Sequence, residues 1–217
     1  MRAALESLLR ARKLDVTLTP GSAVPAPPER LAPTGCAALD AALGGGLRRG
    51  HLSELTGAAS SGRTTLAIGA LAAAAARGEA VALIDACDRF DPASAAAHGL
   101  ALPHLLWVRG PGDATRALKA FSLVLQAGGF GLVVLDLADV AAAALRRFPW
   151  TTWMRIARIV EGSETAAVVV GTERIARSAG GVTIALESRP ARWAGAASQA
   201  RLFTGVEPAP RVVGGRL

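Results

Sequence analysis

A loop between residues 57 and 64 contains the residue types that phosphate binding requires. Its sequence, GAASSGRT, places two glycines with four residues between them, followed by Arg63 and Thr64. Backbone N–H groups of such a loop, at the start of a helix, bind phosphate oxygens, and the Thr64 hydroxyl can hold Mg²⁺. The usual cation in this motif is a lysine, a compact charge, whereas arginine is longer, planar and forked. The spacing therefore predicts a phosphate-binding loop whose cation has a different geometry.

An acidic residue is expected beside this loop. Asp136 ends the apolar run Leu132–Asp136, which is the position of the carboxylate that supports Mg²⁺ in the Walker-B role. The alternative, which we favour, is a strand-end acid that accepts nearby backbone N–H groups or the Thr64 hydroxyl. The candidate nucleotide-site residues are Gly57, Ser60, Ser61, Gly62, Arg63, Thr64, Thr65 and Asp136.

Short apolar runs alternate with helical segments through the middle of the chain, and these elements must position the site. Strands are expected at His51–Thr56, Ala80–Asp85, Leu105–Val108, Leu132–Asp136, Ala166–Gly171, Val182–Glu187 and Arg201–Thr204. Helices are expected at Thr64–Arg77, after the caps Asp91 and Asp113, and at Pro149–Glu161. This order predicts an α/β fold, a mainly parallel sheet with helices on both faces and right-handed crossovers.

The chain is expected to have a head (1–33), a core (34–206) and a tail (207–217). In the head, Met1–Lys13 is predicted to be a short helix with an apolar stripe of Leu5, Leu8 and Leu9. A helix of this length is marginal alone, so it is expected to dock on a surface, in cis or in trans. A proline-rich linker follows and stays extended. The tail, with two prolines and two glycines, is expected to be flexible.

Composition limits the function classes. Of the 217 residues, 51% are hydrophobic and 19% are charged, so a sizeable core can form and wholesale disorder is excluded. The longest apolar run, Leu66–Ala76, is too short for a membrane span, and Met1–Arg10 lacks the order of a secretory signal. Cys36 and Cys87 have no CxxC spacing, which indicates a reducing cytoplasm, and the scattered histidines predict no metal site.

The net charge of +7 is concentrated in the second half of the chain. Residues 1–108 have a net charge of +1 and residues 109–217 a net charge of +6. Such a surface suits nucleic acid or an acidic protein, and arginines beside aromatic rings can bind single-stranded DNA weakly. The alternative, which we favour, is an amphipathic helix with tryptophan in the core and arginine in solvent. The candidate patch contains Arg146, Arg147, Trp150, Trp153, Arg155, Arg158, Arg174, Arg177, Arg189 and Arg192.

Two longer runs make the chain similar to the RecA recombinase family. The run Pro33–Gly50 (PTGCAALDAALGGGLRRG) precedes the phosphate loop, and Leu83–Pro92 (LIDACDRFDP) follows it. The similarity covers Pro33 to Asp136 well and becomes weaker toward Arg192. It implies a RecA-like ATPase core in which the phosphate loop binds ATP and Mg²⁺.

Four further parts of that ATPase pattern are altered. Cys87 stands where the resemblance implies the glutamate that activates water, and a cysteine cannot act as a carboxylate base. Thr172 or Glu173 stands where it implies a glutamine that senses the γ-phosphate. The DNA-binding loop is shortened to about Glu173–Gly181, and no lysine follows Lys119 to reach a neighbour's ATP site. The resemblance therefore implies a relative that does not hydrolyse ATP and needs neither ATP nor Mg²⁺.

The chain also resembles the ImuA family of bacterial mutagenesis accessory proteins, which are shortened RecA relatives. This resemblance implies a cytoplasmic role in SOS-linked translesion synthesis, beside the Y-family relative ImuB and an error-prone polymerase complex. It also implies contact with RecA itself. The alternatives are an ATP-dependent recombinase paralogue, a single-stranded-DNA-binding module and, with no feature in its favour, a cell-division inhibitor of the SulA type.

Overall fold

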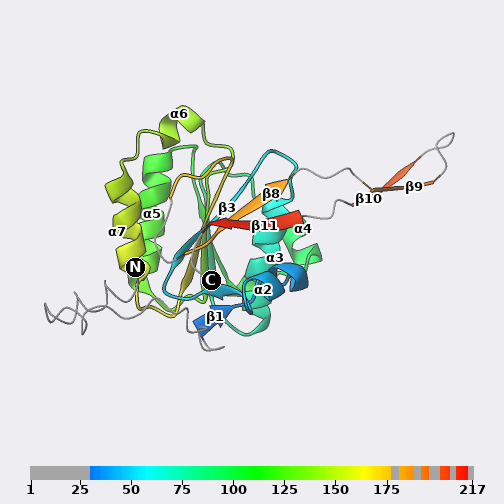
Figure 1. Cartoon of the computed structure of the whole chain (residues 1–217), viewed down its shortest axis with the longest axis horizontal. Helices are drawn as coiled ribbons and strands as arrows, with labels where there is room; N and C mark the ends of the chain where they lie inside the picture. The colour runs from blue at the N-terminus through cyan, green and yellow to red at the C-terminus, as the bar shows by residue number, and fades with distance from the viewer. Residues whose placement is uncertain (1–29, 177–180, 188–191, 196–200, 206–208, 215–217) are drawn as a thin grey trace, which may run out of the picture.

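The central element is a mainly parallel sheet with helices on both faces (Figure 1). The structure, a computed structural model, describes residues 30–176, 181–187, 192–195, 201–205 and 209–214. The strands are β1 (Leu31–Ala32), β2 (Leu47–Arg48), β3 (Leu52–Gly57), β4 (Val81–Asp85), β5 (Leu105–Arg109), β6 (Leu132–Asp136), β7 (Ala166–Gly171), β8 (Thr183–Glu187), β9 (Arg192–Ala194), β10 (Leu202–Gly205) and β11 (Ala209–Gly214). The α-helices are α2 (Ala37–Ala42), α3 (Arg63–Ala76), α4 (Pro92–Ala97), α5 (Ala114–Ala127), α6 (Ala142–Leu145) and α7 (Trp150–Val160).

Seven strands form the main sheet in the order β11-β8-β3-β7-β6-β4-β5. All neighbours are parallel except β11, which runs antiparallel to β8. The expected α/β fold is therefore confirmed. Parallel strands end at the same edge, and Asp85 lies opposite Asp136 while Thr56 lies opposite Gly171. The ends of β3, β4, β6 and β7 are thus brought together at this carboxyl edge, as the motif spacing requires.

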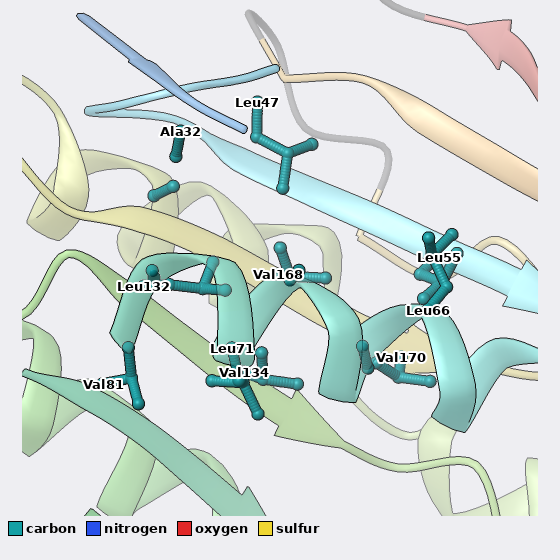
Figure 2. Packing of buried hydrophobic residues seen from close by; sticks show 14 of the residues in the cluster. Ala32, Leu47, Leu55, Leu66, Leu71, Val81, Leu132, Val134, Val168 and Val170 are labelled. Carbon is teal, nitrogen blue, oxygen red and sulfur yellow. The ribbon is translucent and has the colours of Figure 1, made fainter. Parts of the chain in front are cut away.

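Each face of the sheet packs against its own helices. Helix α3 covers one face, where Leu66 and Leu71 pack over valines of β6 and β7 (Figure 2). Helices α5 and α7 cover the other face with a cluster that includes Phe121, Trp153 and Ile156. Parallel strands covered on both faces bury nearly every residue, and β4 and β7 are buried throughout. The apolar runs expected as strands are therefore explained by burial on two sides.

Two helix starts are set by aspartate caps, as the sequence predicts. The carboxylate of Asp91 accepts the N–H groups of Ala93 and Ser94 at the start of α4. The carboxylate of Asp113 accepts the N–H groups of Thr115 and Arg116 at the start of α5. Each cap satisfies N–H groups that have no partner within the helix, which is worth about 1 kcal/mol.

The run from Thr34 to Gly46, which contains Thr-Gly, Leu-Asp and Gly-Gly-Gly, has a structural role. The Asp40 carboxylate accepts the Thr34 N–H at 2.8 Å and the Thr34 hydroxyl at 2.7 Å, which closes the turn before α2. Gly46 has a φ of +143°, and a Cβ there would lie 2.4 Å from the carbonyl oxygen of Ala32. Only glycine permits this close approach between the end of β1 and the residue before β2. The run therefore holds α2 and the β1–β2 pair in place.

The flexible tail expected for residues 207–217 is wrong for its middle part. Residues Ala209–Gly214 form β11, and Val212 packs against the α3 side of the core. Pro210 and the glycines suggest a strand breaker, but β11 lies at the edge of the sheet, where a missing N–H costs no ladder bond. Strand β11 therefore adds residues 209–214 to the main sheet, beyond the expected core boundary at 206.

Several expectations fall outside the described residues. The predicted helix Met1–Lys13 with Leu5, Leu8 and Leu9, most of the linker, Arg177 and Arg189 belong to this group. Among the described residues, the elements not expected from sequence are β1, α2, β2, the 3-10 turn Leu102–His104, α6, β9 and β11. Strand β9 pairs antiparallel with β10, and this pair stands off the main sheet (Figure 1). Within the part of the chain that the structure describes, no helix is long and apolar enough to cross a membrane.

Candidate nucleotide site

The loop of residues 57–62 connects β3 to α3 at the carboxyl edge of the sheet, which is the context that the sequence predicts. Ser60 and Gly62 have φ values of 60° and 92°, so the backbone turns sharply before the first helical residue, Arg63. A Cβ on Gly57 would lie 2.5 Å from the Ser61 hydroxyl and 2.7 Å from the Leu186 carbonyl oxygen. Consecutive turns of this kind orient backbone N–H groups toward an anion.

Arg63 is buried behind this loop, with only 7% of its surface exposed. Its Nη1 donates to the carbonyl oxygen of Gly57 at 2.6 Å and to that of Gly171 at 3.1 Å. The guanidinium therefore joins the start of the phosphate loop to the end of β7. A charged group held by two carbonyls in the protein interior is costly to withdraw, because it would leave both oxygens unpaired. In this conformation the guanidinium bonds two carbonyl oxygens of the protein.

The hydroxyls of the loop occupy different environments. Thr64 and Thr65 are exposed at the start of α3, so Thr64 is accessible to a metal-bound phosphate. Ser61 is 1% exposed, and its hydroxyl has no hydrogen-bond partner among the described residues. An unpaired buried hydroxyl costs about 1–3 kcal/mol. The loop backbone and Thr64 thus fit a phosphate, whereas the Arg63 guanidinium bonds the carbonyl oxygens of Gly57 and Gly171.

Asp136 lies at the end of β6, beside Asp85 at the end of β4. Its Oδ1 accepts the N–H of Ala138 at 2.9 Å, which matches the interpretation as a strand-end acid, although the donor is not Thr64. Burial raises the pKa of Asp136, and the nearby carboxylates of Asp85 and Asp139 raise it further. Asp85 is itself engaged, since its oxygens accept the N–H groups of Arg89 and Phe90. Among the described residues, no three acidic, histidine or cysteine side chains form a metal cluster.

Comparison with known proteins identifies the family. The model of the RecA N-terminal domain matches residues 26–147. The chain belongs to the RecA N-terminal domain family. RecA of Frankia alni is 40% identical over 121 residues, and RecA of Mycobacterium ulcerans is 42% identical over 120 residues. Each match covers 55% of this chain and 34% of the relative, so the chain spans about a third of the RecA proteins it matches.

A structural comparison supports the same fold. The crystal structure of the RadB recombinase matches with a TM-score of 0.58 and 20% sequence identity, covering 74% of this chain and 84% of RadB. At this identity the match establishes the architecture alone. This RecA-family chain therefore has the recombinase fold, and its chemistry must be judged from its own residues.

Two positions of the RecA pattern, Cys87 and Glu173, lie among charged side chains. Burial raises the pKa of the Cys87 thiol, and the carboxylates of Asp139, Asp136 and Asp85 raise it further, so the thiol stays protonated at neutral pH. The neighbouring Asp88 is held by Arg109, which donates through Nε and Nη2 at 2.7 Å each. After β7, Glu173 pairs with Arg146 at 3.4 Å.

A buried acid that the sequence analysis missed holds the connection after β7. Glu54 in β3 is 2% exposed, and its Oε1 accepts the N–H groups of Ile175 and Ala176 at 2.7 and 2.6 Å. Thr183 and Arg174 approach the other carboxylate oxygen at 3.4 and 3.8 Å. A lone acid in the strand Leu52–Gly57 was the available signal. It predicts a buried polar partner, although not which one.

The ten residues of the candidate patch do not form one surface. The carboxyl edge has three of these residues close to it: Arg146, Arg147 and Trp150, which is 45% exposed. Arg146 pairs with Glu173, and this pair brings Arg174 near them. Arg155 and Arg158 are exposed farther along α7. Trp153 is buried in the core, as the amphipathic-helix interpretation predicts. Arg192 belongs to β9 in the hairpin, and Arg177 and Arg189 lie outside the described residues.

Proposed function

We propose that this RecA-family protein does not hydrolyse ATP and acts as an interaction protein in SOS mutagenesis. The observation that carries this proposal is the placement of Arg63, whose guanidinium binds the carbonyls of Gly57 and Gly171. In a phosphate loop the cation must reach the β- and γ-phosphates to stabilise the charge that develops during transfer. Arg63 instead links the start of the phosphate loop to the end of β7.

The residues at and beside the position expected for a catalytic base, Cys87 and Asp88, support the same proposal. A general base must carry a pKa near the working pH and lie within reach of the attacking water. The raised pKa of the Cys87 thiol leaves it protonated, and Asp88 is occupied by Arg109. Neither ATP nor Mg²⁺ is therefore required for the proposed function, even though the loop backbone can accept a phosphate.

The proposed partners follow from the family and from the resemblance to ImuA. A RecA-like core without ATPase function can still bind RecA subunits through the surfaces that RecA copies share. We place this chain with RecA, an ImuB-type relative of Y-family polymerases and an error-prone polymerase complex, in the cytoplasm. By binding RecA, the chain would cap or destabilise the recombination filament and so favour translesion synthesis.

Two measurements test this proposal. Calorimetric titration of the full chain with purified RecA, and separately with an ImuB-type protein, is expected to show saturable binding to at least one of them. ATP turnover with single-stranded DNA present is expected to equal that of the variant Asp136→Ala. Absence of contact with both proteins contradicts the interaction role. DNA-stimulated hydrolysis that Asp136→Ala abolishes contradicts the non-hydrolysing role and supports a recombinase paralogue.

Single-stranded DNA binding is a second candidate, favoured by Arg146, Arg147 and Trp150 near the carboxyl edge. Arginines neutralise phosphates there, and an exposed indole can stack on a base. Fluorescence anisotropy with labelled oligo(dT) is expected to give an affinity that falls steeply as salt increases. An affinity that remains in the high micromolar range at low salt rejects this candidate.

A further inference from the structure

The residues that follow β7, 172–176, form a short strap at the carboxyl edge of the sheet. Its first end is held through Gly171, whose carbonyl oxygen accepts a hydrogen bond from Nη1 of Arg63 at 3.1 Å. Its other end is held by Glu54, whose Oε1 accepts the N–H groups of the last two strap residues at 2.7 and 2.6 Å. Hydrogen bonds at both ends therefore fix the path of the strap.

Apolar packing reinforces the second of these anchors. Ala176 is fully buried in the core cluster of α5 and α7, and the partly buried Ile175 packs against the same cluster. Arg174 approaches the buried carboxylate of Glu54 at 3.8 Å. Moving the strap would expose apolar surface and take two N–H donors away from a buried carboxylate, so the strap is held in one conformation.

The middle of the strap carries an acid that meets an arginine of the carboxyl edge. Oε1 of Glu173 lies 3.4 Å from Nη2 of Arg146, and the two side chains are 44% and 70% exposed. Arg146 is itself held in place, because Leu145 beside it is buried and its N–H bonds the carbonyl oxygen of Ala142 at 3.0 Å. The ion pair thus joins two backbone segments that other contacts already fix.

The fixed backbone decides how strong this ion pair can be. An exposed ion pair is usually weak, because both side chains lose freedom when they meet and water screens their charges. Here the anchored strap already places Glu173 beside Arg146, so less freedom is lost when the pair forms. A polyanion at this edge must displace the carboxylate to reach the guanidinium, and the carboxylate also repels it.

We propose that the strap makes an autoinhibitory contact, in which Glu173 masks Arg146 from the phosphodiester backbone of a single strand. This inference concerns the regulation of the carboxyl-edge surface, and it rests on single-stranded DNA binding as the candidate function. It assigns the control of affinity to an acid of the strap, whereas the candidate function itself concerns the arginines. Loss of the carboxylate charge exposes Arg146 without any change in the fold.

A double-mutant cycle in the full chain tests the masking, with fluorescence anisotropy of labelled oligo(dT) at low salt as the readout. Glu173→Gln keeps the shape of the side chain and is expected to bind about fivefold more tightly than the parent, which corresponds to about 1 kcal/mol. In an Arg146→Ser background the same change is expected to alter the affinity less than about twofold, because no arginine remains to be unmasked. The matched control is Glu161→Gln, which removes an exposed acid from an ion pair with Arg158 at the end of α7 and should leave the affinity nearly unchanged.

The outcomes separate the masking from the candidate function. A gain from Glu173→Gln that disappears in the Arg146→Ser background supports masking. Equal affinities of the parent and Glu173→Gln contradict masking, although DNA binding itself stands. Equal gains in both backgrounds, or an equal gain from Glu161→Gln, also contradict it, because they would reflect net charge alone. If neither the parent nor Glu173→Gln binds more tightly than the high micromolar range, both the masking and the candidate function are rejected.

Discussion

At position 63, arginine in place of lysine changes which atoms the cation of the phosphate loop can contact. A lysine at this position places a point charge among phosphates, whereas a guanidinium has several donors that two carbonyls can occupy at once. Here those carbonyls belong to Gly57 and Gly171. The sequence predicts the loop and the altered cation, but not the bond to Gly171, because that residue lies 108 positions away along the chain. The contact depends on the pairing of β3 with β7.

Replacing Arg63 by alanine is expected to lower the free energy of unfolding. The change removes the hydrogen bonds that the guanidinium donates to the carbonyl oxygens of Gly57 and Gly171, and a lost hydrogen bond to a charged group costs about 1.5–3 kcal/mol. Urea unfolding followed by tryptophan fluorescence measures the loss. The control Thr64→Ala alters an exposed side chain one residue away and should change stability by no more than about 0.5 kcal/mol. Equal stability of the two variants would show that Arg63 does not tie the loop to β7.

Asp136 is expected to give a stability difference that depends on pH. Its pKa is raised in the folded state above the ordinary value of 3.8, mainly by burial, so folding favours the protonated form. The native state then binds more protons than the unfolded state, and the Asp136 contribution to stability declines as pH rises above about 3.8. Asp136→Asn removes this titration but keeps an oxygen for the Ala138 N–H.

The Asp136→Asn variant should therefore gain stability relative to the parent as pH rises from about 3.5 toward neutral. In this range the folded and unfolded carboxyl groups differ in protonation. Thermal unfolding of both proteins in EDTA, without Mg²⁺, measures the difference. Glu164→Gln serves as a control at an exposed acid that does not influence the pKa of Asp136. A difference between parent and Asp136→Asn that is independent of pH would contradict the raised pKa.

At the scale of elements, local signals predict most of the fold. Apolar runs between aspartate caps and glycines place β4, β6 and β7 with ends within one residue of the observed ones, because burial on two sides leaves little choice of residue type. Edge strands are harder to recognise, since they tolerate proline, glycine and exposed arginine. β11 is the example, with Pro210 and Arg211 in a strand that pairs with β8.

Val212 tests whether β11 belongs to the core. Val212→Ser is expected to reduce the free energy of unfolding by about 1–2 kcal/mol, because it places a hydroxyl against the α3-side cluster. Arg211→Ser changes the adjacent residue, whose exposed ion pair with Glu187 contributes little. Chemical denaturation compares the two variants. If both leave the midpoint unchanged, residues 209–214 do not form a strand of the core.

At the scale of the whole molecule, the charge surplus is divided among separate surfaces. The first half of the chain is nearly neutral, with a net charge of +1, and contains the phosphate loop. The basic second half places Arg146, Arg147 and Arg174 near the carboxyl edge and Arg155 and Arg158 along α7. The carboxyl edge is also where the phosphate loop and the connection after β7 lie. A polyanion bound there would touch the phosphate loop, whereas one bound along α7 would not.

This division predicts which arginines matter for binding single-stranded DNA. The double variant Arg146→Ser and Arg147→Ser is expected to weaken binding at low salt about tenfold or more and to reduce the salt slope by up to about 1.4, since each phosphate contact contributes about 0.7 on a single strand. Arg155→Ser with Arg158→Ser removes the same charge from α7 and should leave both quantities nearly unchanged. Anisotropy titrations at several salt concentrations compare the two. Equal losses would mean that net charge, and not the carboxyl edge, determines the affinity.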